Sequence, residues 1–204
     1  MMKEKKDVIE QTNLAFEFIQ KLYSEASYLI KEIEGILREE KEGFIIGRPS
    51  GYGISTRSST GLESHSVKLW LVSKFAVFFV PKDKTELRGG QTITRLDSDL
   101  KVLYLRILLS QKEVSEPVIW SGVLFGVQKK PQTRHITKFE KVMAHIEYND
   151  SKVFADHGRV NYEDSYMQLR GELLTNNLFD INDSETIVSK IVRPSLELYR
   201  RISV

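Results

Sequence analysis

The first 42 residues carry the feature that most constrains how this chain can fold: two rows of apolar residues at helical spacing. One row alternates steps of four and three residues, and the other repeats every seven residues beside it. Together they cover an arc of roughly 100°, the width of a helix face that lies on a protein core. No proline interrupts the run and Gly43 is a natural end, so the pattern predicts one long amphipathic helix over residues 1–42. The rows are Val8, Thr12, Ala15, Ile19, Leu22, Ala26, Leu29, Ile33 and Ile36, and Ile9, Phe16, Tyr23, Ile30 and Leu37.

The length of this helix is informative. About 35 residues at 1.5 Å each span roughly 52 Å, whereas the remaining residues should form a body roughly 40 Å across. The helix must therefore overhang the body, bend, pair with a second chain, or break near Gly35 into a second short helix. Because an apolar stripe left in water is a liability, we expect a homo-oligomer that forms through the N-terminal helix. Heptad spacing alone does not fix the number of partners.

Residues 43–204 are predicted to form an α+β domain that makes one structural unit with the helix. Runs of β-branched and aromatic residues indicate strands, and the short link between 109 and 118 favours an antiparallel hairpin. Lys82 to Asp99 is predicted to be a loop or a ragged hairpin. The expected strands are 44–46, 52–58, 74–80, 102–109, 118–127 and 166–174.

Two further helices are predicted in this domain. Helical spacing from Ile136 to Ile146 indicates one after Pro131, and Asp183 or Ser184 can cap a C-terminal helix that Pro194 kinks or breaks. The predicted fold class is therefore α+β, with a mainly antiparallel sheet of about five to seven strands, a long N-terminal helix and a C-terminal helix. The order of elements is also similar to the sensor-like sheets of PAS and GAF domains, a likeness of fold that implies no function.

Composition excludes several classes of site. The chain has no cysteine, which excludes a disulfide framework, thiolate zinc sites and cysteine nucleophiles. Its first residues lack the apolar core of a secretory signal, and its longest nearly apolar run, 69–81, contains Ser73 and Lys74 and is too short to span a bilayer. We therefore expect a cytoplasmic protein with no membrane partner.

Charge is unevenly distributed along the chain. Lysine and arginine against aspartate and glutamate give 7 against 10 over residues 1–42, 16 against 8 over 43–145, and 7 against 10 over 146–204. The basic middle segment can mark a surface that faces an anionic ligand or nucleic acid. Alternatively, basic strand faces pack against acidic helices of the same fold.

The loop from Gly47 to Gly61 is the best candidate for a ligand site. Its glycines permit close backbone approach, its hydroxyls can donate hydrogen bonds, and Arg48 and Arg57 can fork onto a phosphate or carboxylate, with Tyr52 between them. It lacks the spacing of a P-loop or of a dinucleotide-binding glycine motif. Glycine and serine in a hairpin also serve backbone geometry alone, which is the competing interpretation.

A second set of candidate anion contacts is Lys130, Arg134 and Lys138. They belong to a basic run from Lys129 to Lys141, in which positions 134, 138 and 141 would share one face of a helix. Such a face is often simply solvated. Contact with a nucleic-acid backbone would be sensitive to salt, and the aromatic residues needed for base stacking are not evident in the run.

No pattern of catalytic or metal-binding residues stands out. The four histidines lack metal-ligand spacing, so neither a metal nor a cofactor is expected. The leading hypothesis is a non-enzymatic, self-associating intracellular binding or regulatory protein that engages an anionic ligand. The alternative is a metal-dependent enzyme acting on nucleotides or nucleic acid through the loop 47–61 and acids such as Asp97 or Asp99.

Overall fold

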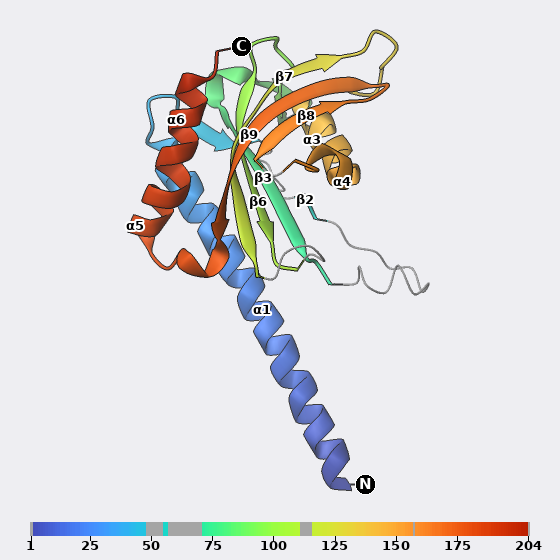
Figure 1. The fold of residues 1–204 in the computed structure, drawn as a ribbon, viewed down its shortest axis with the longest axis vertical. Helices are drawn as coiled ribbons and strands as arrows, with labels where there is room; N and C mark the ends of the chain where they lie inside the picture. Colours follow the sequence, from blue (N-terminus) through green and yellow to red (C-terminus); the bar gives the residue numbers. More distant parts are fainter. Residues whose placement is uncertain (1, 48–54, 57–70, 111–115, 157, 204) are drawn as a thin grey trace.

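A computed structural model describes residues 2–47, 55–56, 71–110, 116–156 and 158–203 of the chain. The α+β prediction is confirmed: helices cover both faces of an antiparallel sheet, and one helix projects far beyond the body (Figure 1). One face carries α1 (Met2–Arg38), α5 (Ser184–Ile187) and α6 (Arg193–Arg201). The other face carries α3 (Phe139–Tyr148) and α4 (Asp150–Val153).

The helix α1 is unbroken over its 37 residues, so the predicted alternative of a break at Gly35 is wrong. It ends at Arg38, and a short turn leads to Gly43, whose φ of 57° lies in the left-handed region that favours glycine. The sequence pattern therefore located the helix, but the helix ends four residues before the predicted boundary at 42, and Gly43 ends the turn that follows it.

Among the described residues, seven strands form the main sheet, in the order β1-β3-β6-β7-β9-β8, with β2 paired to β3 beside β1. Every pairing is antiparallel. The predicted hairpin is formed by β6 and β7, and the polar stretch after Pro81 folds into a separate hairpin of β4 and β5. The strands are β1 (Phe44–Ile46), β2 (Ser55–Thr56), β3 (Lys74–Pro81), β4 (Thr85–Arg88), β5 (Gln91–Thr94), β6 (Lys101–Leu108), β7 (Val118–Lys129), β8 (Arg159–Glu163) and β9 (Met167–Asn177), with a 3₁₀ turn η1 (Lys82–Lys84).

The central strands are buried on both faces, which explains why they appear in the sequence as nearly continuous apolar runs. Alternate residues of β6 enter two cores: Tyr104 and Leu108 face α3 and α4, whereas Leu103 and Ile107 face α1 and the C-terminal helices. The sheet is thus the shared wall of two hydrophobic cores, and the inner half of α1 closes one of them.

Two predicted helices differ in detail from the sequence pattern. The helix after Pro131 begins only at Phe139, and Lys138 precedes it with extended backbone. The C-terminal helix is capped by Asp183 as predicted, and five residues of π-helix, η3 (Val188–Val192), separate α5 from α6, which has Pro194 in its first turn. The π segment lies where the missing proline N–H disrupts regular α-helical bonding.

Candidate functional site

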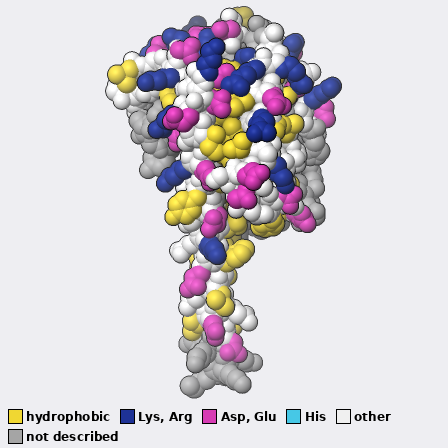
Figure 2. Space-filling model, turned by 90° about the vertical axis from the view of Figure 1, so that its left-hand side faces the viewer, with side chains coloured by type: hydrophobic (Ala, Val, Ile, Leu, Met, Phe, Trp, Pro, Cys, Tyr) yellow, Lys and Arg dark blue, Asp and Glu magenta, His cyan; other side chains and the backbone are white. Residues whose placement is uncertain are grey.

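The outer half of α1 projects from the body without intramolecular cover (Figure 1). Every residue from Asp7 to Phe18 is exposed, including several large apolar ones: Phe16 is 60 % and Phe18 66 % exposed. Figure 2 shows hydrophobic side chains along the projecting helix, interspersed with acidic ones, and more of them where the helix meets the body. The exposed large apolar residues of this segment are Val8, Ile9, Leu14, Phe16 and Phe18.

The exposed stripe continues the buried face of the same helix. An α-helix completes five turns in about 18 residues, and positions 18 residues apart therefore point the same way. Ala26, Ile30, Ile33 and Leu37 are buried against the sheet and the C-terminal helices. The residues 18 positions before them are Val8, Thr12, Ala15 and Ile19, of which the first three are exposed and Ile19 is half-buried. One apolar face thus runs from the core into solvent.

The helix joins the body at Tyr23. The Tyr23 hydroxyl donates a hydrogen bond of 2.8 Å to the Val72 carbonyl oxygen, and its ring packs edge-on against Phe75 at 5.4 Å between centroids. From Asp7 onward, Ala26 is the first buried residue of α1. These contacts fix the direction in which the preceding turns project.

A groove of about 290 Å³ lies at this junction, between α1 and the segment that follows β9. Its floor is apolar, with Leu22 and Leu29 on one wall and Phe179 and Ile181 on the other. Its rim carries acids: Glu25 and Glu32 on α1, and Asp183 at the start of α5. Phe179 belongs to η2 (Leu178–Asp180) and remains 61 % exposed. The groove is therefore an apolar hollow with an acidic edge, placed where the exposed stripe reaches the body.

A buried ion network explains part of the basic character of the middle segment. Arg106 of β6, only 2 % exposed, pairs with Glu147 at 3.1 Å and with Asp150 at 2.8 Å. Lys74 also pairs with Asp150, and the Tyr104 hydroxyl donates to Glu147 at 2.6 Å. The Arg106 guanidinium lies 4.6 Å from the Phe154 ring centroid. Basic strand residues here pack against acids of α3 and α4, as the second interpretation of the charge pattern predicted.

Burial sets the protonation behaviour of this network. Desolvation raises the pKa of the Glu147 carboxyl, and the Arg106 guanidinium opposes that rise. Burial and the adjacent Glu147 carboxylate also raise the pKa of the Tyr104 hydroxyl. A lone arginine inside the apolar run of β6 was the sequence signal for this network, because a charge is rarely buried without a partner.

Of the predicted anion contacts near Pro131, Lys130 is ion-paired with Glu163. Arg134 is exposed and Lys138 half-buried, and both precede α3, so the prediction that they share a helical face with Lys141 is wrong. The helix begins later than the charge spacing suggested because the chain is still extended at 138. Arg48, Tyr52 and Arg57 lie outside the described residues.

The structure places an aromatic residue beside this basic segment that the local sequence did not reveal. Tyr166, 44 % exposed, packs edge-on against His135 at 5.2 Å between ring centroids. Its carbonyl oxygen accepts hydrogen bonds from the Lys130 N–H and the Thr133 hydroxyl. Tyr166 comes from the β8–β9 turn, so only tertiary structure brings it here.

The acids of the alternative enzymatic hypothesis are engaged with cations. Asp99 accepts from Lys84 at 2.7 Å, and Asp97 lies 3.3 Å from Arg95. Lys101, two residues after Asp99, donates to the carbonyl oxygens of Tyr199 and Ile202 at the end of α6. These contacts tie together the β4–β5 hairpin, β6 and the C-terminal helix, which is a structural role.

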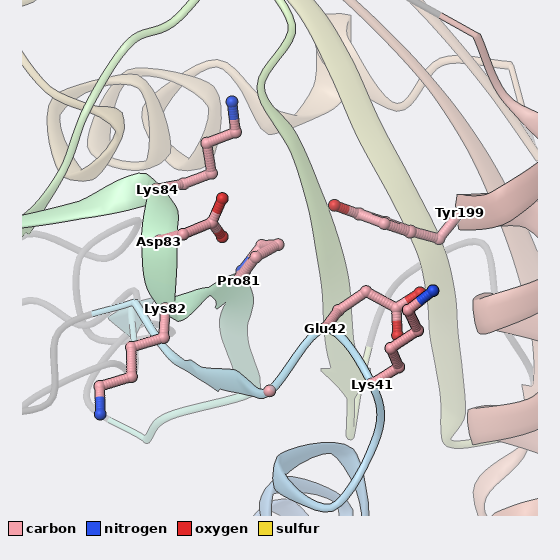
Figure 3. Close-up of a pocket in the computed structure, with 8 residues that line it drawn as sticks. Lys41, Glu42, Pro81, Lys82, Asp83, Lys84 and Tyr199 are labelled. Atoms are coloured by element: carbon pink, nitrogen blue, oxygen red, sulfur yellow. The ribbon is translucent and has the colours of Figure 1, made fainter.

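A wide cleft of about 870 Å³ lies nearby, between the turn after α1, η1 and Tyr199 (Figure 3). Asp83 and Tyr199 point toward one another across it, whereas Lys82 points away. Lys84 and Glu42, also at its edge, are held by Asp99 and Arg200. Its lining is thus of mixed charge, and two of its charged residues, Lys84 and Glu42, are ion-paired with residues outside the lining.

Among the described residues, no group of three or more histidine, aspartate and glutamate side chains is arranged to hold a metal ion. In the same part of the chain, no helix combines the length and apolar character needed to cross a bilayer. Comparison with known proteins finds no family model, curated protein or solved structure that matches this chain.

Proposed function

We propose that this chain is a self-associating binding protein whose projecting helix pairs with a second copy. The observation that carries the proposal is the apolar stripe of α1, which leaves the core and continues into solvent. The exposed turns contribute no packing to the monomer. A second helix against the stripe would remove Val8, Ile9 and Phe16 from water, which is the main favourable term in protein association.

Sedimentation equilibrium of the full chain tests the proposal. We expect a mass of twice 23.6 kDa at micromolar concentration, shifting to one chain in Phe16→Glu. Phe16 occurs twice in a symmetric dimer. Replacing Phe16 in both copies removes roughly 2–4 kcal/mol of association free energy, which raises the dissociation constant roughly 30- to 700-fold.

The matched control is Leu87→Glu. Leu87 is an apolar residue of the β4–β5 hairpin and is 77 % exposed, so the substitution changes surface hydrophobicity by a similar amount away from α1. The control should retain the dimer mass. A wild-type chain that sediments at the mass of one chain at 100 µM, or a dimer that Phe16→Glu leaves intact, contradicts the proposal.

A second candidate function is binding of single-stranded nucleic acid at the segment from Lys129 to Lys141. It is favoured by the contact of exposed Tyr166 with His135, since aromatic faces beside cations suit stacked bases and phosphates. Lys141 and the exposed Tyr148 add a cation and an aromatic ring about two turns apart on α3. The neighbouring acid Glu140 is turned to the Thr94 N–H at 2.9 Å.

Fluorescence anisotropy with a labelled oligonucleotide tests this second function. We expect binding that weakens as salt rises, and a several-fold loss in Arg134→Gln. Arg193→Gln provides the control, because Arg193 is likewise exposed but lies on α6. Equal affinity in both variants would refute a role for this segment, and full displacement by inorganic phosphate would indicate a simple phosphate site.

A further inference from the structure

We infer that the two copies pair antiparallel along the projecting turns of α1, with the two bodies at opposite ends of the paired helices. The inference rests on the proposed self-association and adds its geometry. Two independent observations lead to it: the direction of the apolar face and the length of the projecting segment.

The direction of the apolar face excludes a parallel, in-register pair. The stripe that begins at Val8 and Ile19 continues as Ala26 and Leu37, which the sheet and C-terminal helices already cover. In a parallel pair the partner's helix would run along that same face toward the body. The inner half of the partner's helix would then need the space that the sheet and η3 fill. An antiparallel partner leaves in the opposite direction, and the two bodies lie at opposite ends of the paired helices.

The length of the projecting segment matches one antiparallel register. Two antiparallel helices that pack along apolar rows spaced by four and three residues bring one residue of each helix together in every layer. Val8 can therefore lie opposite the partner's Ile19, and Thr12 opposite the partner's Ala15. Continuing that register places Met2 opposite the partner's Glu25. The first residue of each helix therefore lies one residue short of the partner's Ala26, where the burial of α1 against the body begins. Small residues at the central layers allow the two backbones to approach closely, and Phe16 can fold over the partner's Ile9.

Disulfide trapping tests the orientation, and the chain suits it because it contains no cysteine. Val8→Cys and Ile19→Cys are made in separate full-length chains, one of which carries a tag so that the two differ in mass. In the antiparallel register the two positions are neighbours. Each position is about 11 residues, roughly 16 Å, from its own copy in the partner, beyond the reach of a disulfide.

Under mild oxidation we expect the mixed chains to give at least tenfold more covalent dimer than either variant alone. The covalent product should contain one tagged and one untagged chain. Trapping of Val8→Cys with itself, in a chain that sediments as a dimer, would overturn the antiparallel arrangement and leave the proposed self-association standing. A dimer that traps in neither case would overturn this register. A chain that sediments as a monomer would end both proposals.

Discussion

Replacing Arg106 by methionine should strongly destabilise this fold, because it leaves charges buried without their main partner. Arg106 is 2 % exposed and pairs with Glu147 and Asp150, whose side chains are themselves largely buried. Methionine keeps much of the apolar volume that packs against Phe154. The variant therefore isolates the loss of the positive charge from the loss of packing.

The expected loss is roughly 3–5 kcal/mol of unfolding free energy, the usual cost of removing one partner of a buried ion pair. For a chain of this size each kcal/mol lowers Tm by about 2–4 °C. Thermal unfolding followed by circular dichroism should thus show a decrease of roughly 6–20 °C. The comparison must be made at one protein concentration, because association itself raises Tm.

The loss should also depend on pH, with a definite sign. Burial raises the pKa of Glu147 above its ordinary value of 4.5, and removing Arg106 raises it further. A carboxyl whose pKa is higher in the folded state stabilises the fold below its unfolded pKa, and this contribution is lost as pH rises through the folded pKa. Protonated Glu147 carries no unpaired charge, so the variant should lose less stability at pH 5 than at pH 8.

The matched control is Arg88→Met. Arg88 makes an ion pair with Glu86 at 3.2 Å, but its side chain is mostly exposed, so the same substitution should cost less than about 1 kcal/mol. Equal, small losses in both variants would refute the claim that the Arg106 network is energetically important. A large loss in Arg106→Met that does not change between pH 5 and 8 would refute the role assigned to Glu147.

Three further predictions concern backbone space and acid sensitivity. Gly122→Ala should lower stability by about 1–3 kcal/mol or more, because a Cβ there would lie 2.1 Å from the Glu172 carbonyl oxygen; urea unfolding measures the loss. Gly35→Ala meets no atom within 4 Å and should stabilise α1 by roughly 0.5–1 kcal/mol, so a decrease in Tm would contradict the open helical site. Burial alone would raise the pKa of Asp164, but hydrogen bonds from the Met167 and Tyr166 N–H groups, His145 and Tyr162 lower it to about 2. Its contribution to stability is therefore lost as pH falls from about 4 to 2, and Asp164→Asn should show a smaller stability loss over that window in an acid titration.

The parts of the fold that the sequence predicted are those with strong local patterns. The long helix was located from its apolar rows, and β3, β6 and β7 from apolar runs that burial on both faces requires. By contrast, β8 was missed, because only Val160 and Tyr162 alternate inward along its five residues. Two inward residues are too weak a signal to separate a short edge strand from a loop.

The candidate surfaces were less predictable, because they depend on residues far apart in the chain. The apolar stripe was visible in the sequence, but the groove at its base needs Phe179 and Ile181 to lie against α1. The partners of Arg106 are 41 and 44 residues away, so no local spacing could reveal them. The contact between Tyr166 and His135 likewise exists only after the β8–β9 hairpin has formed.

The apolar character of the projecting turns has no explanation within the monomer. Phe16 and Phe18 are exposed, and these turns lack the packing of an amphipathic face that gives most helices in proteins their stability. A second helix would both cover these rings and hold the turns helical. The amide protons of residues 8–20 should therefore exchange quickly with solvent in dilute protein, below the dissociation constant, and slowly in concentrated protein. Those of β6 should be protected equally in both, because the core does not depend on the partner. Protection of residues 8–20 that does not change over a hundredfold dilution, in a chain shown to dissociate over that range, would mean that the stripe is not what the second copy covers.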